Sequence, residues 1–152
     1  MGYNTAATEW PSTSPSPQIK ALIDQFFLLL DSDSLDTGDR LAETIFMPDG
    51  TMVGPGGAAE GSEAIRRSRD EAWKLVKTRR HTVIRVYAHD AQSLDLLLLG
   101  HVKMELANGK DVAGDFTARI TLVAEDASQT PKIKLYQVWA DSAPMKKALQ
   151  DD

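Results

Sequence analysis

The first half of the chain shows the apolar spacing of helices. Over 17–31 the apolar positions spread around a broad face, which predicts a helix buried on most sides, with Ser16 as its N-cap. A shorter helix is predicted over 39–46 and a third over 61–78. Between these two helices, 51–53 is predicted to be a short strand that leads into a loop rich in Gly and Pro.

The second half alternates apolar and polar residues with the period of two that is typical of strands. Strands are predicted over 80–88, 93–106, 112–124 and 133–140. Turn-forming residues separate them, and Asn108-Gly109 is the strongest hairpin signal among these. Because short turns join consecutive strands, we expect an antiparallel meander, and the helices of the first half must cover one face of it. The pattern predicts an α+β fold, a curved antiparallel sheet with three N-terminal helices over its concave face.

The two faces of the predicted sheet differ in polarity. On the strand 93–106 every second residue is apolar or glycine, and this face should lie against the helices. Leu97 and Leu99 on the other face indicate that it is covered as well, most simply by a second copy of the chain. We therefore expect a homodimer through the sheet. Small residues on the helix-covered face, such as Gly100 and Gly114, are compatible with a cavity or with close helix packing.

Composition narrows the class of protein. The chain has 152 residues, of which 42% are hydrophobic and 26% charged, as expected for one globular domain. Residues 1–16 are rich in Ser, Thr and Pro and are predicted to be a flexible N-terminal tail before a single domain over 17–152. No segment resembles a signal peptide or a membrane span, so we expect a cytoplasmic protein with no membrane partner.

Charge and residue types exclude several kinds of partner. The net charge of −5 makes nucleic acid an unfavourable partner, and the absence of cysteine excludes disulfides and thiolate metal sites. The basic run between 66 and 80 is interrupted by acidic residues and is predicted to be a solvated helix face. His81, His89 and His101 lack metal-ligand spacing. We therefore expect no metal and no other cofactor.

Several phrases of the sequence resemble one known family. They are LAETIFMPDGTM at 41–52, GSEAI at 61–65, RRHT at 79–82, GKDVAGDFTARITL at 109–122 and LYQVWADSAP at 135–144. Over about 18–149 the chain resembles the SnoaL-like branch of the NTF2-like superfamily, most of all small uncharacterised fungal proteins. The resemblance implies a cone-shaped barrel, a curved sheet that wraps a pocket. Such proteins include polyketide cyclases, ketosteroid isomerases and dehydratases, besides non-catalytic binding proteins, so the fold alone does not determine the function.

His81 is the first candidate for a catalytic residue. It falls where the third predicted helix meets the first long strand, and it is similar to a catalytic histidine of scytalone-dehydratase-like members. A neutral imidazole there would move a proton next to a carbonyl. The alternative is a histidine that caps the end of the helix. Phe26 and Phe27 stand where such dehydratases have water-holding tyrosines, and His101 lies on the polar face of its strand, which argues against simple dehydration.

Asp115 is the second catalytic candidate. Acidic residues in this region act as acid or base in several SnoaL-like cyclases, and a carboxylate in an apolar cavity suits proton transfer. The alternative is a surface ladder in which Asp115 and Arg119 pair with Lys103 or Glu105 at the dimer face.

The remaining candidates would bind the substrate. Trp139 facing inward would form a floor for a flat molecule, and Gln137 would donate a hydrogen bond to its carbonyl. The other predicted lining residues are Trp73, Phe116, Met52 and Phe27. For each of them, ordinary core packing is the alternative.

Two functions follow from these residues. The first is a cofactor-independent isomerase, cyclase or dehydratase that transfers a proton on a medium-sized apolar carbonyl compound, such as a polyketide or terpenoid. The second is a non-catalytic dimer that binds a small ligand or a protein.

Overall fold

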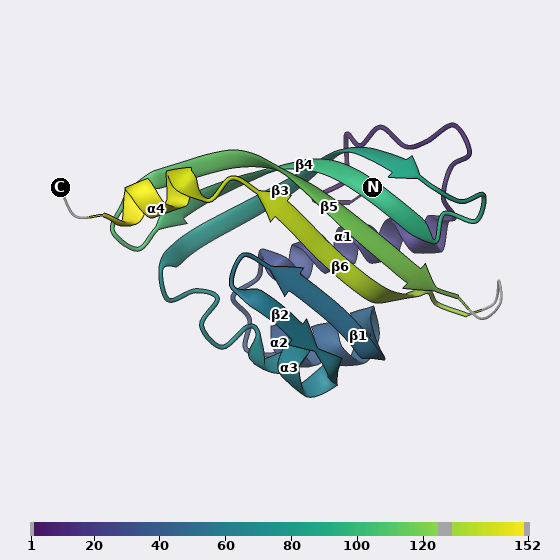
Figure 1. Cartoon of the computed structure of the whole chain (residues 1–152), viewed down its shortest axis with the longest axis horizontal. Helices are drawn as coiled ribbons and strands as arrows, with labels where there is room; N and C mark the ends of the chain where they lie inside the picture. The colour runs from purple at the N-terminus through teal and green to yellow at the C-terminus, as the bar shows by residue number, and fades with distance from the viewer. Residues whose placement is uncertain (1, 125–128, 151–152) are drawn as a thin grey trace.

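A six-stranded sheet forms the body of the molecule (Figure 1), in a computed structural model that describes residues 2–124 and 129–150. The strands are β1 (Phe46–Gly54), β2 (Gly57–Glu60), β3 (Val76–Ala88), β4 (Asp95–Leu106), β5 (Asp111–Val123) and β6 (Lys132–Ala140). They lie in the order β2-β1-β6-β5-β4-β3. The turn expected between β5 and β6 lies partly outside the described residues.

The α+β prediction is confirmed, but the sheet is mixed. Neighbouring strands are antiparallel except β1 and β6, which are parallel because the connection between them runs through the rest of the sheet. Strands β2 and β3 form opposite edges, so the curved sheet is not closed into a barrel. The predicted hairpin between β4 and β5 is present, and Gly109 adopts the positive φ of 84° that its turn requires.

Helix α1 (Pro17–Leu30) lies along the inner face of the sheet, behind it in Figure 1. As predicted, Ser16 caps it, and its Oγ accepts a hydrogen bond of 3.3 Å from the Ile19 N–H. The second predicted helix is α2 (Thr37–Arg40) followed by a π-helical turn, η1 (Leu41–Ile45). Helix α4 (Ala143–Leu149) follows β6. None of the helices in the described part of the chain is long and apolar enough to cross a bilayer.

The prediction for the third helix is wrong beyond residue 67. Helix α3 (Gly61–Arg67) is followed by turns, and β3 already begins at Val76. Pairing with β4 overrides the helical pattern here, because Val76 lies opposite Leu106 and is buried with it in a small apolar cluster. His81 therefore lies within β3, and the alternative that it caps the end of the third helix is wrong.

The register of the sheet decides which side chains face α1. Phe116 on β5 lies beside Gly100 on β4 and Val83 on β3, and all three are buried on the inner face. Two residues along, His81, Val102 and Gly114 form the next row of the same face. The predicted apolar faces of β4 and β5 are thus the buried faces, and the main core lies between them and α1.

The segment 2–16, for which composition predicts a flexible tail, lies along β3 in the structure. Glu9 forms a bridge with Arg85, and its backbone N–H donates to the Ile84 carbonyl at 2.9 Å. The Val83 N–H donates to the Asn4 carbonyl at 2.9 Å. These bonds satisfy backbone groups at the outer edge of the sheet, which would otherwise be open to pairing.

Candidate active site

The site begins with a histidine and an aspartate that the chain brings together over 50 positions. Asp31 is the C-cap of α1, and His81 lies on the inner face of β3. The His81 Nδ1 is 2.5 Å from the Asp31 Oδ1, and the His81 backbone N–H donates to the Asp31 Oδ2 at 2.8 Å. The two side chains are only 12% and 4% exposed, respectively. An ionised carboxylate in this place holds the proton on Nδ1, which leaves a lone pair on Nε2.

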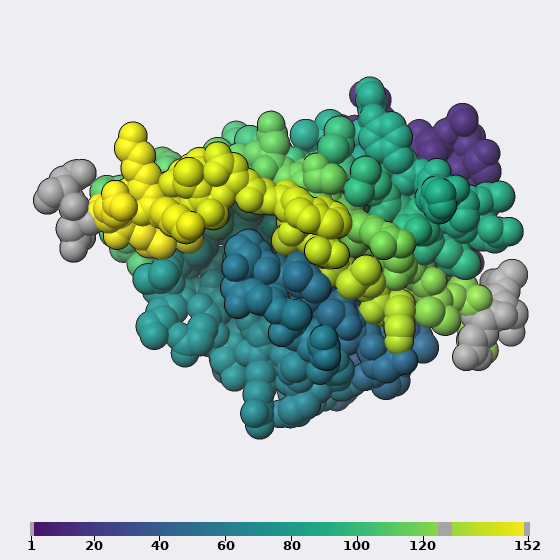
Figure 2. All heavy atoms as spheres, viewed as in Figure 1, coloured from purple at the N-terminus to yellow at the C-terminus, as the bar shows by residue number. Residues whose placement is uncertain are grey.

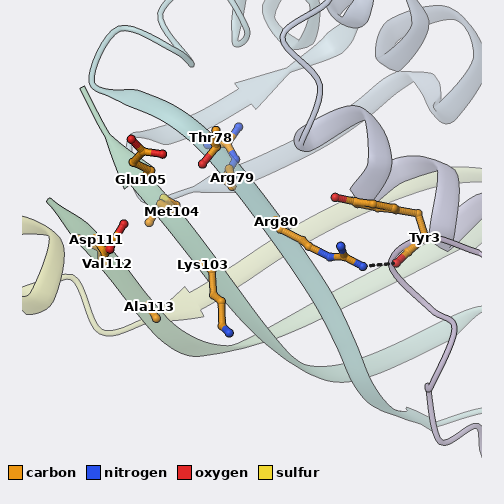
Figure 3. A pocket seen from close by; sticks show the side chains of 10 residues that line it. All are labelled: Tyr3, Thr78, Arg79, Arg80, Lys103, Met104, Glu105, Asp111, Val112 and Ala113. Carbon is orange, nitrogen blue, oxygen red and sulfur yellow. Dashed lines mark hydrogen bonds between the residues drawn. The ribbon is translucent and has the colours of Figure 1, made fainter. Parts of the chain in front are cut away.

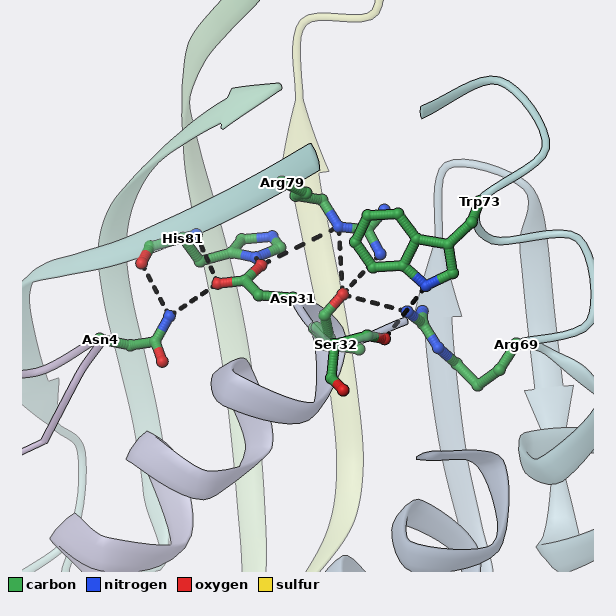
Figure 4. A network of polar contacts seen from close by, with 8 residues as sticks. Asn4, Asp31, Ser32, Arg69, Trp73, Arg79 and His81 are labelled. Atoms are coloured by element: carbon green, nitrogen blue, oxygen red, sulfur yellow. Dashed lines mark hydrogen bonds and ion pairs between the residues drawn. The ribbon is translucent and has the colours of Figure 1, made fainter. Parts of the chain in front are cut away.

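Two arginines lie next to this pair at the end of α1 (Figure 4). Both donate to the Leu30 carbonyl, Arg69 at 3.0 Å and Arg79 at 2.6 Å. Burial lowers the pKa of Arg79, while the nearby Asp31 charge acts in the opposite direction. Burial and the charge of Arg79 lower the pKa of Arg69 to about 10. Both side chains stay cationic at neutral pH, so they offset the carboxylate and the negative end of the helix dipole.

Aromatic rings hold the imidazole in place. The His81 ring centroid lies 5.3 Å from that of Phe27 and 5.5 Å from that of Phe116. The Phe116 ring covers Gly100, where any side chain would collide with it. Glycine at this position is therefore required for Phe116 to reach the histidine. The predicted lining residues Phe27 and Phe116 do lie at the site, buried as its apolar wall.

Two polar atoms of the site have no hydrogen-bond partner among residues 2–124 and 129–150. No hydrogen bond from a described residue reaches His81 Nε2 or the Tyr136 hydroxyl, and neither is among the buried side-chain atoms left unpaired. The His81 side chain is 12% exposed and Tyr136 is 4% exposed, so the histidine is the more accessible of the two residues. Burial of the Tyr136 ring raises the pKa of its hydroxyl far above the usual range, although the charge of Arg79 opposes this. Tyr136 is accordingly a hydrogen-bond donor at neutral pH.

The surface is hollowed between α4 and the β1–β2 hairpin (Figure 2). Along the inner face, burial decreases from Phe116 to the next row, where His81, Val102 and Gly114 are all partly exposed. A side chain added at Gly114 would meet no atom within 4 Å. The inner face is thus less covered in the row of His81 than in the row of Phe116, and the space beside Gly114 is open.

A second histidine–aspartate pair lies on the opposite face of the same sheet. His101 Nδ1 is 2.7 Å from the Asp115 Oδ1, but the Asp115 side chain is 85% exposed. These residues fill the register row between His81 and Phe116, so they point away from α1. The expectation that Asp115 shares a cavity with His81 is wrong. Its surface partner is His101, while Arg119 pairs with Asp95.

Gln137 and Trp139 also lie on the outer face, and the prediction that they face inward is wrong. Leu122 lies opposite Ile133, but Thr121 lies opposite Leu135, so Lys134 is an extra residue in β6. This bulge reverses the alternation of the strand. The inward positions after the bulge are Tyr136 and Val138. Trp139 is 49% exposed as a result.

The other two predicted lining residues, Trp73 and Met52, contact neighbours of His81 and not His81 itself. Trp73 stacks on the Arg79 guanidinium, 4.7 Å from the ring centroid, and its Nε1–H donates to the Ser32 carbonyl at 3.0 Å. Met52 is partly buried on β1, beside Tyr136 in the register. Both hold the ends of the site in position, and Met52 forms part of its apolar surroundings.

An open groove of about 570 Å³ lies at the edge of the sheet, near the start of β3. Figure 3 shows Tyr3, Arg80 and Lys103 around it, with Arg80 donating to the Tyr3 carbonyl. His81 does not line this groove, and neither does any other predicted site residue. The groove adjoins the site through Arg79, which lines it and lies beside Asp31.

Solved structures provide the comparison with known proteins. A proposed SnoaL-like polyketide cyclase from Jannaschia sp. CCS1 superimposes with a TM-score of 0.66 at 12% identity, covering 91% of this chain and 98% of that chain. The chain has an NTF2-like fold. A proposed scytalone dehydratase from Novosphingobium aromaticivorans DSM 12444 shares this fold (TM-score 0.61, 12% identity, 82% of each chain covered). So does a type 2 hexachlorocyclohexane dehydrochlorinase, LinA (TM-score 0.60, 16% identity, 82% and 83% covered).

No protein-family model and no curated protein matches the sequence. At these identities the structural likeness establishes the NTF2-like fold alone, and the fungal affinity of the sequence phrases stays a prediction. The function must be argued from the residues of the site.

Sequence reasoning missed Asp31, Arg79 and Tyr136 as site residues. The sequence pattern marks Asp31 only as the residue that ends a helix, although an acidic residue at a helix C-terminus is electrostatically unfavourable and is itself a signal. Arg79 shares a strand face with His81, two positions away, once the helix is known to end early. Strict alternation along β6 places Tyr136 on the outer face, and only the bulge turns it inward.

Proposed function

We propose that this NTF2-like protein is a cofactor-independent enzyme that transfers a proton at carbon, with His81 as the general base. The observation that carries the proposal is the buried Asp31 carboxylate, 2.5 Å from His81 Nδ1, with the rings of Phe27 and Phe116 against the imidazole and no described residue hydrogen-bonded to Nε2. A carboxylate that fixes the tautomer and stabilises the imidazolium is how a histidine becomes an effective base.

The class of substrate follows from the side chains that lie around His81. The rings of Phe27 and Phe116 contact the imidazole, and Phe27 also contacts the ring of Tyr136, whose hydroxyl is the polar group that we assign to the substrate. A small, mostly apolar molecule with one carbonyl group fits this arrangement, as polyketide- and terpenoid-like ketones do. The names of the structural neighbours, a cyclase, a dehydratase and a dehydrochlorinase, support reactions of this type.

In the proposed reaction, His81 Nε2 removes a proton from the carbon next to the carbonyl. The electron pair of the C–H bond moves to the carbonyl oxygen, which becomes an enolate. Tyr136 donates a hydrogen bond to this oxygen, and the positive charge of Arg79 stabilises it. The protonated His81 then returns the proton to another carbon, which completes an isomerisation. Alternatively it protonates a neighbouring hydroxyl group, which leaves as water while the enolate collapses to an unsaturated ketone.

Exchange of carbon-bound hydrogen in D2O tests this proposal even while the natural substrate is unidentified. Proton NMR would follow a panel of β-hydroxy ketones and unsaturated cyclic ketones with the wild-type protein. We expect exchange or conversion of at least one of them, and a loss of about 10²–10⁴-fold in His81→Ala. His101→Ala is the matched control, since it removes the outer histidine of a similar pair. Equal rates in the two variants would reject His81, and a bound ligand recovered unchanged with no exchange would favour a binding protein.

We also propose that the outer face of the sheet forms a homodimer. Tyr87, Leu97, Leu99 and Trp139 are each at least 38% exposed there, and the cross-strand register places them on one face. A single chain leaves this apolar surface in water, and a second copy would cover it. Light scattering during size-exclusion chromatography tests the proposal, and a monomer at high concentration would contradict it.

A further inference from the structure

The segment before α1 brings one polar side chain into the interior. Asn4 is 1% exposed, although it lies among exposed residues of a segment rich in Ser, Thr and Pro. A buried amide costs free energy unless it is hydrogen-bonded, so its partners show why it is there. The partners of its side chain are Asp31 and His81, the two residues of the proposed catalytic pair.

The amide group of Asn4 connects the two residues (Figure 4). Its Nδ2 donates to the Asp31 Oδ2 at 2.8 Å and to the His81 backbone carbonyl at 2.8 Å. Because both acceptors lack a proton, only one orientation of the amide satisfies them. The Asp31 Oδ2 thus receives two donors, Asn4 Nδ2 and the His81 N–H, while its Oδ1 remains for the imidazole.

Asn4 is itself fixed from both sides. Its backbone N–H donates to the Asp24 Oδ1 at 2.9 Å, and its carbonyl accepts from the Val83 N–H at 2.9 Å. Thr5 adds two more hydrogen bonds to the same Asp24 oxygen, at 3.0 and 2.9 Å. Gly2 lies so close to Asp24 that any side chain would collide with it. The segment is therefore anchored to α1 and to β3 at the point where Asn4 enters.

The alternative is that Asn4 only joins the segment to the domain. Backbone bonds from Asn4, Thr5 and Glu9 already do this, and a buried amide adds little to them. The Oδ1 of Asn4 is buried, and no residue in the described part of the chain donates a hydrogen bond to it, which costs free energy. The side chain is thus better explained by what its Nδ2 does to the carboxylate than by stability.

We infer that Asn4 is a positioning residue of the site: it holds the Asp31 carboxylate in the orientation that fixes the tautomer of His81. This inference rests on the proposed function, because it assigns Asn4 to the same reaction. The side chain of Asn4 bonds to Asp31 and to the backbone of His81, so its effect on the imidazole passes through Asp31. Within the segment 2–16, Asn4 is then the residue that serves the site, while Thr8 and Glu9 attach the segment to β3.

The test compares Asn4→Ala with Thr8→Ala. Thr8 belongs to the same segment and donates to the Val83 carbonyl at 2.7 Å, but touches neither Asp31 nor His81. We expect kcat for the exchange reaction to fall about tenfold in Asn4→Ala with KM unchanged, as is typical of residues that orient a catalytic group. Thr8→Ala should keep the wild-type kcat while losing a comparable amount of thermal stability.

A second measurement needs no substrate. In protein labelled with 15N-histidine, the NMR signals of the His81 ring report which nitrogen carries the proton. We expect Asn4→Ala to shift these signals and Thr8→Ala to leave them unchanged. If His81 signals and kcat are the same in the two variants, Asn4 has no positioning role, whatever the enzyme does. If no substrate is turned over but the His81 signals shift in Asn4→Ala, Asn4 does position the Asp31–His81 pair, while the reaction proposed for that pair fails.

If Asn4→Ala does not fold, Asn4→Asp takes its place. Aspartate keeps the size of the side chain but replaces the donor with an acceptor beside a second carboxylate. We expect a kcat at least as low as that of Asn4→Ala and a shift of the His81 signals. Wild-type values of both would overturn the inference.

Discussion

Replacing Asp31 with asparagine should abolish the base without changing the shape of the site. The two donors to the Oδ2 position, the His81 N–H and the Asn4 amide, cannot act as acceptors. The oxygen of the new amide must therefore take the Oδ2 position, and its NH2 group takes the Oδ1 position facing His81 Nδ1. Nδ1 must then accept a hydrogen bond, which places the ring proton on Nε2 and removes the lone pair that attacks the substrate.

The expected loss is large. An aspartate-to-asparagine change that keeps the geometry but imposes the wrong histidine tautomer lowers kcat about 10⁴-fold in serine proteases. A loss of this size raises the barrier by about 5 kcal/mol. We expect a reduction of about 10³–10⁴-fold here, because the Asp31 side chain is 4% exposed and water cannot replace it.

The assay is the initial rate of exchange or conversion of the best compound of the panel, measured at saturation. Asp115→Asn is the matched control, because it makes the same chemical change in the outer histidine–aspartate pair, whose carboxylate is 85% exposed. It should retain the wild-type rate. The 15N signals of His81 should show a proton on Nε2 in Asp31→Asn. A rate for Asp31→Asn equal to that of Asp115→Asn would refute the assignment of the base.

Four further variants test the surroundings of the pair and the outer face of the sheet. Gly114→Leu should raise KM for bulky ketones and keep thermal stability, because the added side chain enters open space on the inner face. Michaelis–Menten kinetics and a melting curve would measure both effects. An unchanged KM would argue against substrate binding at this position. Gly100→Ala should lower the free energy of unfolding in urea by about 1–3 kcal/mol, since its methyl group collides with Phe116, whereas wild-type stability would mean that the ring can move away. Leu99→Glu should convert the proposed dimer into a monomer, which light scattering would detect, and an intact dimer would place the interface elsewhere. Trp139→Ala, on the same outer face, should keep the wild-type turnover.

The fold could be predicted from the sequence because it depends on patterns that persist over many residues. The α+β class, the position of α1 and the buried faces of β4 and β5 all follow from apolar periodicity. Features that depend on a single residue, such as a bulge, cannot be predicted from apolar periodicity. One extra residue at Lys134 turned Gln137 and Trp139 outward and brought Tyr136 in. The early end of α3 likewise depends on pairing with β4, a partner that no local pattern names.

The site was only half predictable for a related reason. His81 carries its own chemical signal, but Asp31 is 50 positions away and ends a helix, where an acidic residue repels the helix dipole. In the structure this unfavourable charge is stabilised by Arg79, His81 and Asn4, which come from two other parts of the chain. A carboxylate placed where its own helix disfavours it, and held there by three separate residues, is explained by what it does to the imidazole. The exposed Asp115 needs no such support, and for that reason the reaction is expected to depend on Asp31 and not on Asp115.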